Sequence, residues 1–247
     1  MTFLTHLGTY VTTMKGMFAR PENPKMYWKE FMHQCVEIGL GSVPIVLIIS
    51  AFLGAVMTVQ TAYQLVSNLI PLSTIAVVVR DSMLLELSPT VICVVLAGVV
   101  GSKIASELGN MRISEQIDAL EIMGINTKTY LILPKIVASL LTIPLLITLS
   151  ILIALWGGRF VGDVAGIIDS ATYDEGLMRD FQPFNVTVAM VKAFTFALLI
   201  SSISAYFGYN VKGGALEIGR SSTLSVVVSC ILILLADYVI TLIMLNP

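Results

Sequence analysis

The pattern of apolar and polar positions along the chain contains five long hydrophobic runs separated by short polar segments. The runs cover residues 45–65, about 82–105, 131–156, 186–209 and 222–245. About 20 helical residues are needed to cross the roughly 30 Å hydrocarbon core of a bilayer, and each run reaches that length. The pattern therefore predicts an all-α integral membrane protein with about five transmembrane helices.

The ends of two spans need a separate argument. The second apolar stretch is too long for one crossing, since residues 72–106 would reach about 52 Å as a helix at 1.5 Å per residue. We therefore place Arg80 and Asp81 at the outer boundary of the membrane. The third span contains Pro144, and Gly157-Gly158 is expected to end it.

Residues 1–20 have a mixed polarity that differs from the five spans. Tyr10, Val11, Met14 and Met17 follow one another at helical spacing on an apolar face, opposite a row of threonines. This pattern is typical of a helix lying in the membrane interface, and it lacks the continuous apolar core of a signal peptide. Pro21 and Pro24 are expected to end this helix.

A second helix of mixed polarity follows as far as Leu40. Gly39, Gly41 and Pro44 are expected to break it before the first span begins. We therefore expect N-terminal interfacial helices over residues 1–44 and a transmembrane domain over 45–247.

Composition narrows the class of protein. Hydrophobic residues make up 56% of the chain and charged residues 12%, with a mean hydropathy of +0.90, which indicates membrane insertion. A net charge of −2 argues against a nucleic-acid partner. The three cysteines predict no disulfide framework, and the two isolated histidines predict no metal site.

The polar segment between the second and third spans carries a repeat of small residues. Ala97, Gly101, Ala105 and Gly109 recur every four residues, which puts them on one helix face. Small side chains let another helix approach closely in a membrane. We expect this face to pack tightly against a neighbouring helix.

A short helix is expected directly after this face, over about residues 113–124. Ser114 is the expected N-cap, Glu115 lies in the first turn, and Gly124 is the expected stop. Apolar residues at helical spacing form one stripe: Ile113, Ile117, Leu120, Ile122 and Met123. The helix is too short to cross a bilayer, so it must lie against something, and an ordinary interfacial connector is the simplest interpretation.

A long motif favours a more specific interpretation. Residues 97–125 read A-G-x-x-G-S-x-I-A-x-E-L-G-x-M-R-x-x-E-Q-I-D-A-L-x-x-M-G-I, which resembles the signature of the MlaE/YrbE-type permeases. Further pieces downstream extend the resemblance from about Pro44 to the C-terminus. It implies the membrane subunit of an ABC transporter that moves lipids between bacterial membranes.

The resemblance also implies the partners of such a subunit. They are an ABC ATPase that carries the ATP and magnesium, an MCE-domain protein, a lipid substrate and a second copy of the chain in a homodimer. The chain itself would bind no cofactor. The short helix would be the cytoplasmic coupling helix, and the residues expected to meet the ATPase are Glu115, Gln116, Asp118 and Glu121.

Basic residues predict the orientation. With the N-terminus in the cytoplasm, the inner segments hold ten Lys and Arg residues and the outer ones only Arg159 and Arg179. This distribution satisfies the positive-inside rule for a multi-pass protein of the bacterial inner membrane. The acidic segment over about 158–185 is then an outer loop. The inner basic residues are Lys15, Arg20, Lys25, Lys29, Lys103, Arg112, Lys128, Lys135, Lys212 and Arg220.

Three charged residues lie inside apolar spans. Counted from the outer ends of their spans at 1.5 Å per residue, Glu86, Lys192 and Asp237 lie about 7, 10 and 12 Å deep, in one layer. Unpaired charges are costly there, so the three are expected to face a partner or water. A structural ion pair and a place on the substrate path both stay open.

The resemblance bears on the same layer. Charges at these positions recur in the family, Gln60 matches a family glutamine, and Leu85 replaces an arginine of the family pattern. Either Arg80 substitutes for that arginine or the site is less basic. Pro89 frees the carbonyl of Leu85 as an additional acceptor.

No catalytic constellation is present in the sequence, so we expect a transport subunit and not an enzyme. One alternative is an ion-coupled secondary transporter that uses Glu86 and Asp237, although paired repeats with broken helices are not visible. Another is a membrane scaffold that transports nothing. Copurification of an ATPase would separate these classes.

Overall fold

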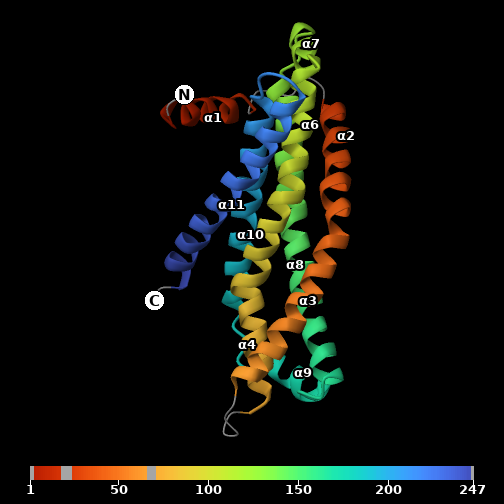
Figure 1. Cartoon of the computed structure of the whole chain (residues 1–247), viewed down its shortest axis with the longest axis vertical. Helices are drawn as coiled ribbons and strands as arrows, with labels where there is room; N and C mark the ends of the chain where they lie inside the picture. Colours follow the sequence, from red (N-terminus) through yellow and green to blue (C-terminus); the bar gives the residue numbers. More distant parts are fainter. Residues whose placement is uncertain (1–2, 18–23, 66–70, 246–247) are drawn as a thin grey trace. The chain divides into compact units, whose positions relative to one another are not determined.

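The computed structural model describes residues 3–17, 24–65 and 71–245, and in these ranges every regular element is helical. The predicted all-α architecture is confirmed (Figure 1). The α-helices are α1 (Phe3–Gly16), α2 (Pro24–Cys35), α3 (Gly41–Gln64), α4 (Ser73–Ser82), α5 (Ile92–Leu96), α6 (Ser102–Ile113), α7 (Gln116–Ile122), α8 (Leu133–Val164), α9 (Ser170–Met178), α10 (Pro183–Tyr209) and α11 (Ala215–Leu245). The π-helical segments are η1 (Val36–Leu40), η2 (Met83–Val91), η3 (Ala97–Gly101) and η4 (Lys128–Ile132).

Five helical runs in the described residues are long and apolar enough to cross a membrane. They cover Lys25–Gln64, Ser73–Ile113, Lys128–Val164, Pro183–Tyr209 and Ala215–Leu245. Each overlaps one of the five hydrophobic runs of the sequence almost completely, so the number of spans is confirmed. The chain is a multi-pass membrane protein.

The first run does not break where the sequence suggested. The helix continues from α2 through η1 into α3, so Gly39, Gly41 and Pro44 lie inside one run. Pro44 lies inside this run and lacks an N–H, and the wider π-helical turn immediately before α3 absorbs the irregularity. Pro24 begins α2, while Phe18, Arg20 and Pro21 lie outside the described residues.

Two further helix boundaries differ from expectation. The helix over Ser73–Ile113 begins before Arg80 and is continuous through it, and Arg80 is 2% exposed within α4. Gly157-Gly158 does not end α8, which runs to Val164. These glycines instead allow a close approach to α3, since a Cβ on Gly157 would lie 2.6 Å from the carbonyl oxygen of Ala51.

The acidic outer segment contains the helix α9, although its sequence predicts a loop. Asp169 caps α9, because its carboxylate accepts a hydrogen bond from the Ala171 N–H at 3.1 Å. Gly176 of α9 sits directly on α4, where an added Cβ would lie 2.3 Å from the carbonyl oxygen of Ser73. The last helix also starts earlier than expected, at Ala215.

The chain divides into two compact units. The first unit comprises Met1–Ser42, Val94–Ile143 and Thr195–Ala236, and the second comprises Val43–Cys93, Pro144–Phe194 and Asp237–Pro247. A buried cluster in the second unit joins α4, η2, α8 and α9 through Ile75, Ala76, Val79, Met83, Ala154, Ile168 and Tyr173.

Candidate transport site and coupling helix

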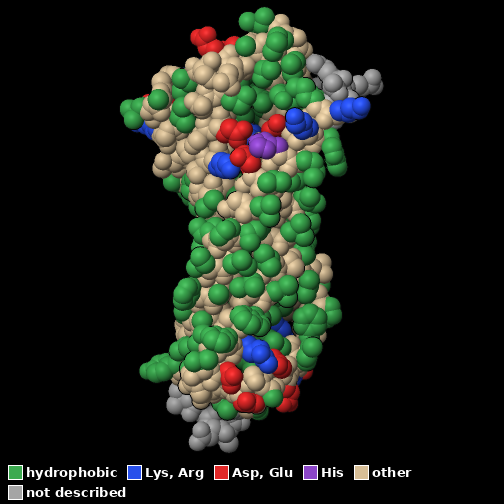
Figure 2. Space-filling model, turned by 90° about the vertical axis from the view of Figure 1, so that its right-hand side faces the viewer, with side chains coloured by type: hydrophobic (Ala, Val, Ile, Leu, Met, Phe, Trp, Pro, Cys, Tyr) green, Lys and Arg blue, Asp and Glu red, His purple; other side chains and the backbone are tan. Residues whose placement is uncertain are grey.

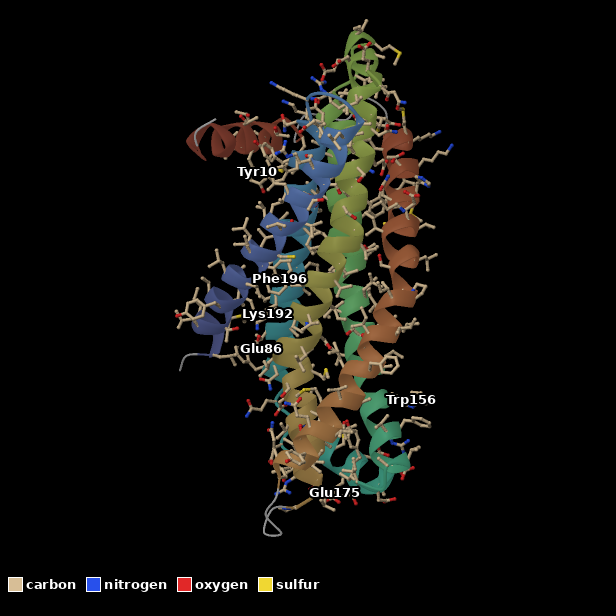
Figure 3. The ribbon with its side chains drawn as sticks, viewed as in Figure 1. Tyr10, Glu86, Trp156, Glu175, Lys192 and Phe196 are labelled. Atoms are coloured by element: carbon tan, nitrogen blue, oxygen red, sulfur yellow. The ribbon has the colours of Figure 1, made fainter. Side chains whose placement is uncertain are left out.

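The second unit brings the three intramembrane charges together in one cluster. Lys192 of α10 lies between Glu86 of η2 and Asp237 of α11, with its ammonium 2.9 Å from Glu86 Oε1 and 2.7 Å from Asp237 Oδ1. Figure 3 shows Lys192 beside Glu86. We call these three residues the charged cluster.

The backbone of η2 completes the surroundings of Lys192. Lys192 Nζ donates a hydrogen bond of 2.7 Å to the carbonyl oxygen of Leu85. Pro89 follows four residues later and has no N–H to donate to this carbonyl, whose oxygen has two lone pairs and accepts from the Lys192 side chain. The three N–H groups of the ammonium thus have three nearby acceptors.

The members of the charged cluster differ in exposure. The side chain of Lys192 is 0% exposed and that of Asp237 is 15% exposed, whereas that of Glu86 is 46% exposed. Thr241 of α11 also donates to Glu86, at 3.4 Å. Two carboxylates and one ammonium give the cluster a net charge of −1, and Glu86 is the member that a ligand can reach.

Two other polar residues lie apart from this cluster. Gln60 is exposed and lines an apolar hollow with Ala55, Tyr63 and Val161. Arg80 donates to the carbonyl oxygens of residues 177, 179 and 180 at 2.8, 2.7 and 3.4 Å. Arg80 therefore holds the segment after α9.

The short helix after α6 begins differently from the prediction. Ser114 is not its N-cap, because the Ser114 hydroxyl donates back to the carbonyl oxygen of Asn110 at 2.7 Å and ends α6. Glu115 occupies the N-cap position in a left-handed conformation, with φ of 58°. Gly124 follows α7 at a φ of 83°, as a C-terminal stop requires.

The acidic residues of α7 have partners inside the first unit. Asp118 accepts a 2.6 Å hydrogen bond from Arg112, whose guanidinium lies 5.9 Å from the ring centroid of Tyr209. Glu121 accepts from Thr127 at 2.9 Å and from Tyr209 at 3.0 Å. We call Arg112, Asp118, Glu121, Thr127 and Tyr209 the α7 clasp, because they tie α7 to the end of α10.

The prediction of an apolar stripe on this helix is only partly correct. Ile117 is fully buried, but Ile122 is 88% and Met123 66% exposed. The two lie at the last turn and C-cap of α7, beyond the turn that packs on the unit. Glu115 and Gln116 are exposed at the other end of the helix.

The small-residue face packs against α10 within the first unit. A Cβ on Gly101 would lie 2.8 Å from Ser204 Oγ. A Cβ on Gly208 would lie 2.7 Å from the carbonyl oxygen of Ala105, so the two backbones are in direct contact. Ala97 is fully buried, and Gly109 faces Val211 and Ile218.

Comparison with known proteins identifies the family. The family described as Permease MlaE matches residues 31–243. The chain belongs to the MlaE permease family. It is 38% identical over 218 residues to a probable ABC transporter permease protein of Rickettsia bellii, covering 88% of this chain and 84% of the Rickettsia protein.

Relatives of this permease occur beyond Rickettsia. The chain is 31% identical over 213 residues to a probable ABC transporter permease protein of Synechocystis, covering 86% and 81% of the two chains. It is 32% identical over 217 residues to the chloroplastic Arabidopsis thaliana protein TRIGALACTOSYLDIACYLGLYCEROL 1, covering 88% of this chain and 62% of the plant protein. The family and these relatives make the chain an ABC transporter permease, which implies an ATPase partner.

Sequence reasoning brought together the members of the charged cluster but missed the α7 clasp. Tyr209 and Thr127 carry no unusual signal in the sequence, and Tyr209 lies 88 residues from Glu121. A tyrosine at the end of an apolar span, followed by a polar turn, is the one feature that could have marked it.

Proposed function

We propose that this permease is the membrane subunit of an ATP-driven transporter that moves phospholipid or a related lipid between bacterial membranes. In this proposal ATP and magnesium are bound by a separate ABC ATPase subunit, and hydrolysis occurs there. An MCE-domain protein exchanges lipid with the permease on the outer side. The permease itself acts as a homodimer in the inner membrane, with its N-terminus in the cytoplasm.

The observation that carries the proposal is the charged cluster within apolar spans of an ABC permease. Charges at membrane depth are costly unless they serve a partner or a pathway. Lys192 and Asp237 largely neutralise each other, whereas the side chain of Glu86 remains 46% exposed. A polar headgroup passing this unit would meet Glu86 first. The name of the Arabidopsis relative contains a glycerolipid, which supports a lipid as the substrate class.

The geometry of the charged cluster refines the role of Lys192. We infer that Lys192 is a positioning residue, because its three donors already face Leu85, Glu86 and Asp237. Direct contact with a headgroup phosphate would require one carboxylate to move away. Lys192 thus sets the position of Glu86 instead of serving as the first contact for substrate.

The surface of α7 supports docking of an ATPase. Ile122 and Met123 are strongly exposed at the end of a short polar helix, where an apolar groove of a partner protein would bury them. Glu115 and Gln116 add exposed polar contacts. Asp118 and Glu121 act differently from the sequence prediction in this proposal, since they hold α7 in place through the α7 clasp.

The proposed homodimer and the proposed orientation are supported by different observations. Helix α11 exposes a row of large apolar side chains within the single chain, which a second copy or lipid would cover: Leu224, Val227, Ile231, Leu234, Leu235, Tyr238, Leu242 and Ile243. The orientation rests on the basic residues counted in the sequence, ten on the inner side against two outside.

The secondary-transporter alternative is less well supported. An ion carrier that uses Glu86 and Asp237 needs carboxylates that can bind and release a cation, yet Lys192 lies within 3 Å of both. Family membership also favours an ATPase-driven mechanism.

Copurification tests the proposal against this alternative. A tagged permease expressed with its native chromosomal partners is solubilised in mild detergent, and the associated proteins are identified by mass spectrometry. We expect a stoichiometric ABC ATPase. A permease that is folded, transports lipid and carries no ATPase would contradict the proposal.

A further inference from the structure

A polar hollow of about 650 Å³ opens on the surface of the first unit. Figure 2 shows this region, with a His side chain (purple) beside acidic (red) and basic (blue) side chains. The hollow is lined by α2, η1, α6 and α11 through His33, Glu37, Lys103, Ser106, Glu107, Asn110 and Ile218. These residues belong neither to the charged cluster nor to the α7 clasp.

The hollow lies on the first membrane-spanning run, before the apolar stretch of α3. Trp28 of α2 is 66% exposed. His33 and Glu37 follow it about 7 and 14 Å further along the same helical run at 1.5 Å per residue. Acyl chains alone would leave these ionisable groups without a polar partner, so the headgroup is the part of a lipid that fits the hollow.

The charges in the hollow are arranged in pairs that leave donors and acceptors available. Lys103 Nζ lies 3.4 Å from Glu37 Oε1, and Lys135 Nζ lies 2.6 Å from Glu107 Oε2. The side chains of Lys103 and Glu107 remain 46% and 37% exposed. Lys103 therefore has N–H groups to spare, and the second oxygen of Glu107 can accept. His33 lies 3.9 Å from Glu37 at the rim.

The balance of charge selects the kind of ligand. Glu37 is paired with Lys103, and Glu107 is paired with Lys135, which is buried and does not itself line the hollow, so these four charges cancel when His33 is neutral. A neutral site with separated charges does not favour a purely anionic group, because the carboxylates repel it. It fits a group that carries one positive and one negative charge.

The spacing of the charges fits the same ligand. Lys103 and Glu107 are four residues apart on α6, so their Cβ atoms lie about 5–6 Å apart on one face. A zwitterionic phospholipid headgroup separates its phosphate from its ammonium by a two-carbon spacer, which is a comparable span.

Apolar residues beside the hollow supply a surface for the rest of the lipid. Val36 and Leu40 of η1 are 52% and 67% exposed, on either side of Glu37 in sequence. The π-helical turn changes the register of side chains along the run, so that Glu37 reaches Lys103 while these two stay exposed.

We propose that this hollow binds the headgroup of a zwitterionic phospholipid, with the phosphate on Lys103 and the ammonium on Glu107. The acyl chains would lie along Val36 and Leu40. This site is distinct from the charged cluster of the second unit. It requires only that the chain spans a membrane, so it does not depend on the proposed transport cycle.

Native mass spectrometry of the full-length permease tests the site. The protein is reconstituted in nanodiscs with equal amounts of phosphatidylethanolamine and phosphatidylglycerol, and the lipids retained after release are counted. We expect several-fold more phosphatidylethanolamine than phosphatidylglycerol on the parent protein. Lys103→Gln should lower that retention several-fold, whereas Lys29→Gln, which removes an exposed lysine of α2 outside the hollow, should not.

Two results would overturn the proposal. They are equal retention in Lys103→Gln and Lys29→Gln, and a preference for phosphatidylglycerol. If Lys103→Gln does not fold, Ser106→Phe fills the hollow without changing charge, and the same loss of retention is expected. Failure of the ATPase copurification would leave these lipid counts unaffected, so the two proposals are tested separately.

Discussion

At the scale of single residues, Lys192 determines whether two carboxylates can remain inside the membrane-spanning part of the chain. It is fully buried, and both of its charged partners lie within 3 Å. Breaking a buried ion pair by removing one partner typically costs about 3 to 5 kcal/mol, because the remaining charge is left uncompensated. The two carboxylates differ in exposure, so they should differ in how much they depend on Lys192.

We expect Lys192→Met to lower both the melting temperature in detergent and the lipid transfer of the permease. Adding Asp237→Asn should restore the melting temperature better than adding Glu86→Gln, because Asp237 is 15% and Glu86 46% exposed. Arg179→Ala, at a half-exposed arginine outside the cluster, serves as the control. Equal rescue by the two second-site changes would contradict the assigned roles.

At the scale of helices, two contacts organise the first unit. The small-residue face allows η3 and α6 to pack on α10, and the α7 clasp fixes α7 to the end of α10. The same helix α10 carries Lys192 in the second unit.

Overpacking tests the small-residue face. Gly101→Leu should lower the melting temperature in detergent, at a cost of about 1 to 3 kcal/mol, because the new side chain meets Ser204 and Ile200. Gly98→Leu is a matched control three residues earlier in η3, where an added Cβ has nothing within 4 Å. A Gly101→Leu protein as stable as Gly98→Leu would show that α10 does not approach as closely as described.

Removing one hydroxyl tests the α7 clasp. Tyr209→Phe deletes the donor to Glu121 but keeps the ring beside Arg112, so a stability loss of only about 1 kcal/mol is expected. We expect the ratio of lipid transferred to ATP hydrolysed to fall while the fold is kept. Tyr238→Phe, at an exposed position of α11, is the control. An unchanged ratio in Tyr209→Phe would exclude a role of the clasp in coupling.

The hydrophobic pattern and helix signals predicted these elements to a large extent. The five spans, the small-residue face and the common depth of Glu86, Lys192 and Asp237 all follow from properties that repeat along one helix. The start of α7 and the continuation of α8 past Gly157-Gly158 did not follow, because contacts with other elements decide them. Ser114 bonds back to Asn110, and Gly157 packs on Ala51.

The sequence also could not predict which residues contact the acidic side chains of α7. Helical spacing showed that Asp118 and Glu121 lie off the apolar stripe, but it could not show what they face. Arg112 and Tyr209 reach them only in the folded unit. A polar face on a short helix is therefore a weaker sign of a partner protein than the exposed Ile122 and Met123 beside it.

At the scale of the whole molecule, the central question is whether α7 joins this permease to an ATPase. Ile122→Asp combined with Met123→Asp should abolish copurification of the ATPase, since it places charges where an apolar groove is expected, while yield and melting temperature stay unchanged. Leu216→Asp, at an equally exposed residue at the start of α11, is the control. Full copurification with the Ile122/Met123 double variant would place the docking surface elsewhere.

The most direct test of the account is ATP-dependent lipid transfer by the reconstituted complex. The permease and its copurified ATPase are placed in donor vesicles containing a fluorescent phospholipid, and transfer to the MCE partner or to acceptor vesicles is followed with ATP or with a non-hydrolysable analogue. We predict transfer that requires ATP hydrolysis and that Lys192→Met lowers. Transfer at the same rate with the analogue, or undiminished transfer by Lys192→Met, would contradict the account.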